Sequence, residues 1–553
     1  MNKKHSRLEV WNFLAWGILL LYVIFLVIPL YKVLQQSVSD GQTGAFTLAN
    51  FKKFFGDYYY LSTLINSFKV SFVVMIFSLL LGVPLAYFYS LYKMKGARFL
   101  QIVIILCSMS APFIGAYAWI LLLGRNGLIT RIILKLTGIQ IGSIYGFKGI
   151  TIALTCRMFP MVFLYTQGAL KSIDNTLLEA STNLGTSELE RFWKVVLPLC
   201  MPSILAAALL TFMRAMSDFG TPLLIGEGYR TFPVEIYNQF LGETSRNYNF
   251  ASAIAVVAIL ITALVFFLQK FVASKFKFTI NAMHTIEQKQ ANPVKNFLIH
   301  LYSYLLVFIA MAPQIYLVYV SFRKTNSTGE VFLPGLSLHS YELAFRKHVP
   351  SIFNTFKLGI ISVALVIFLA VLVAYLVVRR PGIKSQVIDT LSMVPYIIPG
   401  SVVGIALILA FNTKPLVLTG TMVILVVAMM IRRIPYTIRS SVAILGQIPI
   451  SVEEAARSLG TTEMGAFWKI TFPMMSNGVI SGGLLSWVTI ITEMSSSIML
   501  YSAKSITLTV ATYVYVSRGA DGPAAALATI LSVLTFLSLF LFMKISKNKD
   551  VTM

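Results

Sequence analysis

Two stretches of the chain determine its architecture: EASTNLGTSELERFWKVVLP at residues 179–198 and EAARSLGTTEMGAFWKITFP at residues 454–473. Ten of their 20 paired positions are identical, without a gap, at a constant spacing of 275 residues. Farther upstream, a spacing of 288 residues pairs NSFK at residues 66–69 with NTFK at residues 354–357. Chance does not produce this agreement, so we infer two homologous units fused head to tail.

The composition predicts an all-α polytopic membrane protein. Of 553 residues, 57% are hydrophobic and 12% are charged, whereas soluble domains average about 25% charged residues. The net charge of +24 would suggest nucleic-acid binding in a soluble protein. Here the basic residues gather in short loops between apolar stretches. We therefore expect the lipid bilayer, and no nucleic acid, as a partner.

A hydrocarbon core about 30 Å thick needs about 20 apolar residues in a helix, and this rule predicts six spans in each half. In the first half they are residues 12–34, 67–92, 99–123, 149–171, 199–224 and 250–270. In the second half they are residues 298–321, 356–378, 386–411, 418–441, 474–500 and 523–543. The first apolar run is longer than a signal-peptide core and lacks a cleavage site, so we interpret it as a retained span.

Basic loops predict the orientation, because Lys and Arg beside spans are retained on the cytoplasmic side. Such residues follow spans two, six, eight and twelve: Lys93, Lys95 and Arg98; Lys270, Lys275 and Lys277; Arg379, Arg380 and Lys384; Lys544, Lys547 and Lys549. Both termini are therefore expected in the cytoplasm, as is the polar linker from Asn281 to Lys295. The two halves are then parallel repeats about an axis along the membrane normal, with a pathway between them.

The repeated segment is expected to form a short, firmly ended helix in each half. Two capping-box patterns favour a helix start: Thr176-x-x-Glu179 and Ser451-x-x-Glu454. Gly185 and Gly460 suit the helix ends. The small residues between them, which would let a partner surface approach closely, are Ala180, Ser181, Ala455 and Ala456. A plain surface helix between spans would explain one copy, but the matched duplication favours a functional lever.

This segment resembles the signature of binding-protein-dependent ABC importer permeases, E-A-A-x3-G-x9-I-x-L-P. The matching residues are Glu179, Ala180, Ser181, Gly185, Val195, Leu197 and Pro198, and then Glu454, Ala455, Ala456, Gly460, Ile470, Phe472 and Pro473. Ser181, Val195 and Phe472 depart from the pattern, and none adds bulk or charge within the helix. The resemblance implies two six-helix halves of the type I ABC importer transmembrane fold. It also implies that each short helix is a coupling helix docked in a groove of an ATPase subunit.

The same resemblance implies partners and domain limits. No G-x-x-x-x-G-K-[ST] phosphate loop occurs in the sequence, so we expect two separate ATP-binding-cassette ATPase subunits. An extracytoplasmic solute-binding protein and a location in the bacterial cell membrane are also expected. The predicted limits are 1–59 for the first span and outer loop, 60–270 for the first transmembrane domain, 271–349 for the linker, seventh span and outer loop, and 350–545 for the second transmembrane domain.

Nothing in the sequence indicates catalysis, a metal site or a bound cofactor. The three cysteines form no CxxC pair, and the five histidines are scattered. Ser481-Gly482-Gly483 lies in an apolar span and predicts close helix packing rather than phosphate binding. We therefore expect a transport subunit and not an enzyme.

Ionisable residues within the predicted spans are few, and such residues are costly and usually functional. They include Arg157, Asp218, Arg432 with its neighbour Arg433, and Glu493. The repeat spacing pairs Arg157 with Arg432 and Asp218 with Glu493. One interpretation places these residues on the translocation path, and the other makes them structural ion pairs between helices. The sequence leaves both open.

Further segments look like those of fused ferric-iron permeases: DFGTP at 218–222, TEMS at 492–495, LTVA at 508–511 and GPAAA at 522–526. This resemblance makes ferric iron the expected cargo, although permeases for phosphonate, thiamine, polyamine or sugar phosphate share much of it. A secondary transporter with twelve spans is the alternative from another class. It would carry its signature in the loop after span two, and residues 93–98 have none. A structural scaffold would leave the duplicated motif unexplained.

Overall fold

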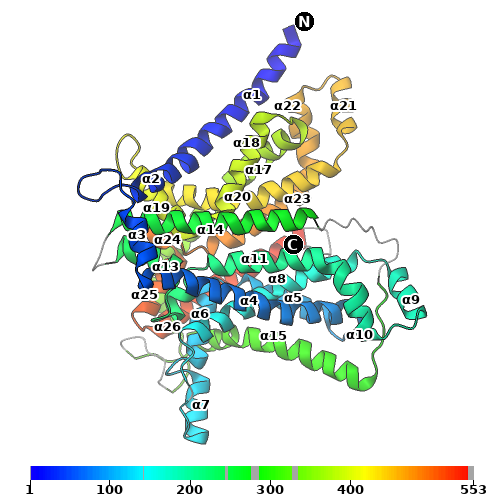
Figure 1. Cartoon of the computed structure of the whole chain (residues 1–553), viewed down its shortest axis with the longest axis vertical. Coiled ribbons are helices and arrows are strands. Elements are labelled where there is room, and N and C mark those ends of the chain that lie inside the picture. Colours follow the sequence, from blue (N-terminus) through cyan, green and yellow to red (C-terminus); the bar gives the residue numbers. More distant parts are fainter. Residues whose placement is uncertain (1, 141, 243–246, 276–285, 327–333, 546–553) are drawn as a thin grey trace. The chain divides into compact units, whose positions relative to one another are not determined.

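The computed structural model describes residues 2–140, 142–242, 247–275, 286–326 and 334–545, and the regular structure of these ranges is helical (Figure 1). Isolated bridges are the only β-type pairings among the described residues. Within the same ranges, ten helices are long and apolar enough to cross a membrane. The prediction of an all-α polytopic membrane protein is confirmed.

Most predicted spans coincide with long helices of the structure. These helices are α1 (Asn2–Tyr22) with α2 (Ile28–Ser37), α4 (Tyr58–Leu91), α8 (Phe147–Lys171), α14 (Tyr248–Lys275), α15 (Pro293–Ser321), α17 (Val349–Arg379) and α26 (Asp521–Ile545). α20 (Met422–Gln447) covers the predicted span 418–441 but is not one of the ten apolar helices. Its three arginines, Arg432, Arg433 and Arg439, lower its apolar character.

The predicted spans 99–123 and 386–411 are wrong as continuous helices. The first divides into α5 (Ala97–Met109) and α6 (Pro112–Leu123). The second divides into α18 (Ile383–Ile397) and α19 (Gly400–Phe411), which meet at 113° and would make an eleventh span if counted together. In both cases a proline begins or directly precedes the second helix. Proline disfavours the helical conformation in the residue before it, which accounts for the two breaks.

Two further spans are shorter than predicted. The helices that replace the predicted spans 199–224 and 474–500 are α11 (Leu197–Met216) and α23 (Phe472–Ile491). Each is followed by a turn that a carboxylate stabilises. Asp218 accepts a hydrogen bond from the N–H of Thr221 at 2.9 Å, and Glu493 accepts one from the N–H of Ser496 at 3.0 Å. Short helices then follow, α12 (Gly220–Ile225) and α24 (Ser497–Leu500).

The helices gather into two compact units that exchange their first spans. The first-copy unit is built mainly from Phe55–Glu235 and Leu260–Ser337, and the second-copy unit from Met1–Phe54, Ile236–Ile259 and Leu338–Lys549. Thus α15 packs on α5 and α6 of the first copy, whereas α1 packs on α17 and α18 of the second copy. The predicted linear domain limits do not anticipate this exchange.

The remaining helices are short and mostly connect the spans. They are α3 (Ala49–Gly56), α7 (Leu128–Thr137), α13 (Phe232–Leu241), α16 (His339–Lys347) and α25 (Leu508–Ser517). Four predictions fall outside the described residues: the basic positions Lys277, Lys547 and Lys549, and the start of the linker at Asn281.

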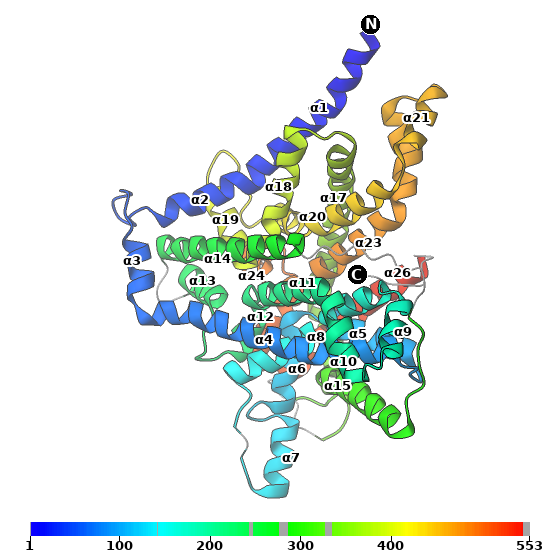
Figure 2. The same ribbon diagram turned by 45° about the vertical axis from the view of Figure 1, so that its right-hand side comes forward.

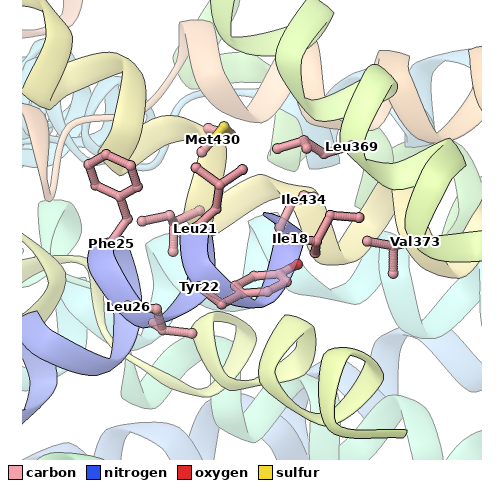
Figure 3. A pocket seen from close by; sticks show the side chains of 10 residues that line it. Ile18, Leu21, Tyr22, Phe25, Leu26, Leu369, Val373, Met430 and Ile434 are labelled. Atoms are coloured by element: carbon pink, nitrogen blue, oxygen red, sulfur yellow. The ribbon is translucent and has the colours of Figure 1, made fainter. Parts of the chain in front are cut away.

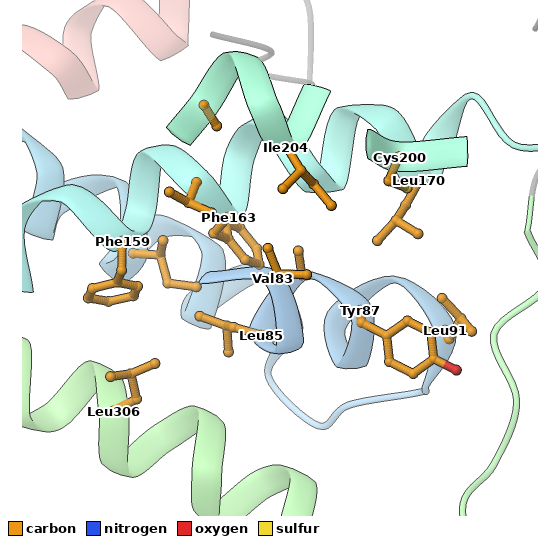
Figure 4. Close-up of a cluster of buried hydrophobic side chains, with 14 of the residues drawn as sticks. Val83, Leu85, Tyr87, Leu91, Phe159, Phe163, Leu170, Cys200, Ile204 and Leu306 are labelled. Carbon is orange, nitrogen blue, oxygen red and sulfur yellow. The ribbon is translucent and has the colours of Figure 1, made fainter. Parts of the chain in front are cut away.

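The core of the first-copy unit is packed around α4. Val83 and Tyr87 of α4 belong to one buried cluster with Phe159 and Phe163 of α8, and α11 and α15 complete it (Figure 4). The cluster reaches as far as Leu178, in the loop after α8. Within a bilayer, helices associate through such close packing, because lipid is as apolar as the side chains.

In the second-copy unit, the N-terminal helix covers the long spans. Ile18 and Tyr22 of α1 line an apolar recess together with Val373 of α17 and Ile434 of α20 (Figure 3). The close packing predicted at the glycine pair of α23 is confirmed. A Cβ atom on Gly482 would lie 2.8 Å from the Cα atom of Thr437 in α20.

Each of three π-helical turns ends two residues before a proline. They are η1 (Val23–Val27), η2 (Phe192–Val196) and η3 (Phe467–Thr471). Proline has no N–H, and its ring clashes with the carbonyl four residues earlier. A wider turn accommodates both effects and keeps the helix continuous. The repeated Phe-Trp-Lys sequence therefore has the same local structure in both copies.

Candidate functional site

The two repeated segments form matching pairs of short helices. The first loop consists of α9 (Asn175–Asn183) and α10 (Glu188–Arg191), and the second loop of α21 (Ile450–Ser458) and α22 (Glu463–Ala466). Each follows a long helix, α8 or α20, and leads through a π-helical turn into α11 or α23 (Figure 2). The predicted short helix in each copy is confirmed.

The first loop does not begin with the predicted capping box. The N-cap of α9 is Asp174, whose carboxylate accepts a hydrogen bond from the N–H of Thr176 at 3.0 Å. Glu179 instead accepts a hydrogen bond from the side-chain amide of Asn175 at 2.6 Å. The prediction is wrong because the helix starts before Thr176, which places the hydroxyl inside the first turn.

The second loop also lacks its predicted capping box. α21 begins before Ser451, and its N-cap is Pro449, which makes no side-chain capping bond. Its first turn is held from within the protein instead. Glu453 is buried and accepts hydrogen bonds from Arg379 Nε at 2.8 Å and from the Tyr375 hydroxyl at 3.0 Å. This carboxylate therefore ties α21 to the end of α17.

Both short helices end in the same way. In each, the N–H of the terminal glycine bonds to the carbonyl three residues back, and the next N–H bonds to the carbonyl five residues back, at 2.9–3.2 Å. Gly185 has a φ of 79° and Gly460 a φ of 88°. This is the Schellman arrangement, which places glycine in the left-handed conformation. The predicted glycine stops are confirmed.

On its inward face, the first loop makes an apolar contact through Leu178 beside the buried polar residues Asn175 and Ser181. Leu178, at the position that corresponds to Glu453, is buried in the same cluster as Tyr87 and Leu91 near the end of α4. The ring of Tyr87 also meets Phe192 edge-on, with centroids 5.0 Å apart. The corresponding tyrosine and phenylalanine of the second-copy unit make the same contact at 4.8 Å. The aromatic contact is thus shared, whereas the contact to the short helix differs.

The end of the linker and the first turn of α15 add a second attachment to the first loop. The N–H of Glu287 donates to the side-chain oxygen of Asn175 at 3.4 Å. Lys295 donates to the hydroxyl of Tyr92 at 2.8 Å and forms an ion pair with Glu188 of α10. Linker residues therefore bridge the first loop and the end of α4.

The second loop makes the corresponding contact without a bridge. In the repeat, Glu463 corresponds to Glu188 of the first loop. Arg380 corresponds to Tyr92, the residue that follows α4. Arg380 pairs directly with Glu463 at 2.6 Å, and Arg457 contacts the same carboxylate at 3.4 Å. The second loop is therefore attached by charged residues of its own copy.

The outward face of each loop carries the motif carboxylate and an exposed leucine at equivalent positions. Glu179 and Ala180 are exposed, as are Glu454 and Ala455, whereas Ser181 and Ala456 point inward and are buried. Leu184 is 85% exposed and Leu459 is 88% exposed. Only half of the predicted small residues therefore face outward, and these exposed leucines extend the surface on which they lie.

The predicted intramembrane charges of the first copy form an ion pair. Arg157 of α8 donates to Asp218 at 2.8 Å, and the Asp218 carboxylate is almost fully buried. Because Asp218 also holds the turn after α11, the pair connects that turn to α8. The structural interpretation of these two residues thus has direct geometric support.

The second copy brings two arginines to one carboxylate. Arg432 and Arg433 of α20 both pair with Glu493, which also accepts hydrogen bonds from the hydroxyl of Ser495 and the N–H of Ser496. Arg432 in addition donates to the Ser495 hydroxyl at 3.0 Å. Both copies therefore lock the same turn, but the second does so with one more positive charge.

No dedicated metal-binding cluster accompanies these charges in the described ranges. There, no group of three or more His, Cys, Asp or Glu side chains could hold a metal ion. The cysteines are free thiols, and Cys107 and Cys200 are buried. The arrangement offers ion pairs, outward-facing helices and a membrane-spanning bundle, which suit transport.

Comparison with known proteins agrees with this geometry. A family model described as "Binding-protein-dependent transport system inner membrane component" matches residues 60–278 and 366–549. These two segments each contain one of the repeated loops.

Three relatives indicate how the likeness is distributed along the chain. The ferric transport system permease protein FbpB of Actinobacillus pleuropneumoniae is 28% identical over 95% of this chain and 77% of its own length. The putative ferric transport system permease protein FbpB 1 of Haemophilus influenzae is 28% identical over 88% of this chain and 77% of its own. The spermidine/putrescine transport system permease protein PotB of Haemophilus influenzae is 28% identical over 48% of this chain and 93% of its own.

Proposed function

The chain belongs to the family of binding-protein-dependent transport system inner membrane components, and from this premise we propose that it forms the translocation path of an ATP-binding-cassette importer for ferric iron. Two separate ATPase subunits supply the energy, and one docks on each repeated loop. An extracytoplasmic binding protein delivers the cargo. The chain is a transport subunit and not an enzyme.

The outward faces of the two loops carry this proposal. Leu184 and Leu459 occupy equivalent positions, both follow a short helix with the same Schellman end, and both are almost fully exposed. One exposed leucine on a surface needs no explanation. Two at repeated positions, beside the exposed Glu179 and Glu454, suit a pair of equivalent partner subunits.

The orientation is part of the proposal. Basic residues at the ends of α4 and α17 favour the cytoplasmic side for those ends. The two loops contact the same ends through Lys295 and Arg380, so they would also lie in the cytoplasm, with both termini. ATPase subunits are then within reach of α9 and α21. The two transmembrane domains would be residues 60–270 and 350–545 of a bacterial cell-membrane protein.

The cargo assignment rests on the length of the likeness. Both relatives named as ferric permeases align with most of the chain, whereas the spermidine/putrescine permease aligns with about half of it. Ferric iron enters here as a transported substrate, and selection among solutes can rest with the binding protein. Phosphonate, thiamine, polyamine and sugar phosphate are the competing cargoes that an uptake experiment would separate.

The intramembrane ion pairs are proposed to border the translocation path. Arg157 with Asp218, and Arg432 with Glu493, hold the turns after α11 and α23. A change in these turns during transport would require the pairs to rearrange. If Arg157→Ala and Asp218→Asn both left uptake and coupled ATP hydrolysis unchanged, this role would be abandoned.

Reconstitution tests the function directly. The chain is co-expressed with the candidate ATPase, purified and placed in proteoliposomes with binding protein loaded with radioactive ferric iron. We expect ATP-dependent uptake, and loss of the bound ATPase in the double variant Glu179→Arg, Glu454→Arg. Uptake driven by an ion gradient without an ATPase would contradict the proposal. Uptake of spermidine or phosphonate in place of iron would overturn the cargo alone.

A further inference from the structure

The attachment of the second loop to α17 differs in chemistry from the attachment of the first loop to α4. Arg379 is the last residue of α17. Its guanidinium donates to Glu453 of α21 at 2.8 Å and to the backbone carbonyl of Ile448, just before α21, at 2.7 Å. Tyr375, one turn earlier in α17, donates to the other oxygen of Glu453 at 3.0 Å.

These charges are removed from water. The Arg379 side chain is 9% exposed and the Glu453 side chain is 5% exposed. Trp11 of α1 stacks on Tyr375 with ring centroids 4.3 Å apart and is itself buried. Charge-assisted hydrogen bonds in such surroundings are strong and directional, so they fix the orientation of one helix relative to another.

The first copy has leucine at both positions. The repeat spacings place Leu91 where the second copy has Arg379, and Leu178 where it has Glu453. Both leucines are buried in one apolar cluster. Apolar contact is non-directional, so these two leucines hold α9 against α4 without fixing its angle. The directional bonds of the first loop run instead to Glu287 and Lys295. The two positions differ together between the copies, as expected for partners in one contact.

We propose that Arg379 and Glu453 are positioning residues that join α21 rigidly to α17, so that the two loops transmit motion to their spans unequally. This inference rests on the proposed function, because it concerns how the docking loops pass movement into the membrane. A movement imposed on α21 turns the end of α17 with it. A movement imposed on α9 is partly absorbed in the apolar contact beside α4.

Distance measurements between matched spin labels test the rigidity without any ATPase. In a full-length chain whose native cysteines are replaced, one label pair is placed at Leu365→Cys and Ser458→Cys. The equivalent first-copy pair is Phe77→Cys and Asn183→Cys. All four positions are exposed. We expect a narrower distance distribution for the second-copy pair, in chains embedded in lipid nanodiscs.

Exchanging the residue types of the two contacts between the copies should also exchange the widths of the distance distributions. The double variant Arg379→Leu, Glu453→Leu should broaden the second-copy distribution to that of the first copy. The double variant Leu91→Arg, Leu178→Glu should narrow the first-copy distribution. Replacing a buried ion pair by apolar residues is often tolerated, so the leucine double variant keeps the test available if single variants do not fold. Equal widths in the unaltered chain, or no broadening in the leucine double variant, would overturn the proposal.

A transport measurement separates a positioning role of Arg379 and Glu453 from an effect on protein stability alone. In proteoliposomes that contain the whole complex, Arg379→Leu or Glu453→Leu should retain bound ATPase but lower iron uptake per ATP by about tenfold, because the directional contact that joins α21 to α17 is lost. Arg439→Leu, which removes an exposed ion pair to Asp389 in the same unit, is the matched control and should leave the ratio unchanged. An unaltered ratio in both single variants would contradict the positioning role. Failure of the unaltered chain to bind ATPase would refute the proposed function and leave the label distances as an independent test.

Discussion

The two units hold equivalent loops and equivalent turns with different chemistry. In the first-copy unit, the loop is attached by the apolar side chain of Leu178 and by the linker residue Lys295. In the second-copy unit, Glu453 and Glu463 attach the loop through two arginines at the end of α17. The Schellman ends and the exposed leucines are nevertheless the same. These features of the outward surface are therefore the same in both copies, whereas the contacts behind it differ.

The turns after α11 and α23 repeat this contrast. Asp218 meets one arginine, whereas Glu493 meets two, and all these side chains are mostly buried. Both copies therefore have a carboxylate at this position, whereas the number of arginines that pair with it differs. Substitutions at corresponding contacts of the two units test these differences.

The largest difference is expected at the buried carboxylates. Glu493→Gln leaves two buried guanidinium groups without a counter-charge and should lower stability by about 3–5 kcal/mol. Asp218→Asn leaves one partly exposed arginine and should cost about 2 kcal/mol, the value of a hydrogen bond to a charged group. Thermal unfolding of the detergent-solubilised chain measures both. Equal losses, or a larger loss for Asp218→Asn, would remove the distinction between the two turns.

The helix ends should respond equally in the two units. Gly185→Ala and Gly460→Ala each force an L residue into the left-handed conformation, which costs about 1–2 kcal/mol. Hydrogen exchange of the last turns of α9 and α21 should accelerate to a similar extent. A marked effect in only one loop would show that the shared Schellman geometry does not have a shared role.

The helix starts should respond unequally. Asp174→Ala removes the side-chain cap of α9 and should destabilise its first turn by about 1 kcal/mol. Pro449→Ala in the second loop removes no capping bond and should leave the first turn of α21 protected, since Glu453 holds it. Hydrogen exchange at the two first turns gives the comparison. Loss of protection in α21 would indicate that the buried carboxylate does not anchor this helix.

The smallest effects are expected at the partly exposed ion pairs. Lys295→Met breaks the bridge between the linker and α10, and Arg380→Met breaks the direct pair to α22. Exposed pairs contribute up to about 1 kcal/mol, and the Arg380 pair is the more buried of the two. Limited proteolysis should therefore cut α22 faster in Arg380→Met than α10 in Lys295→Met. The reverse order would mean that the linker is the stronger attachment.

The sequence predicts the helices better than their interruptions. Hydrophobic length and the internal repeat were sufficient to locate the spans. Prolines were not sufficient to locate the breaks, because Pro84, Pro160 and Pro435 lie inside α4, α8 and α20 without ending them. Whether a proline ends a membrane helix depends on whether neighbouring groups satisfy the freed backbone atoms. That information depends on the tertiary structure and is absent from a local sequence pattern.

The site was predicted at its outward face and missed at its inward face. The motif identified Glu179 and Glu454 together with the glycine stops, because these features are local. Arg379 and Glu453 lie 74 residues apart, and neither belongs to the motif. A signal was nevertheless available, since both positions change from leucine to a charged residue between the copies, and with opposite charges. Comparing the repeats position by position would have indicated their contact.

We propose above all that one chain presents two docking sites to separate ATPase subunits. Native mass spectrometry of the complex purified in mild detergent counts the bound subunits. We expect two ATPase subunits per chain, and none in the double variant Glu179→Arg, Glu454→Arg. A complex with no ATPase, or with two subunits that remain bound in the double variant, would contradict it.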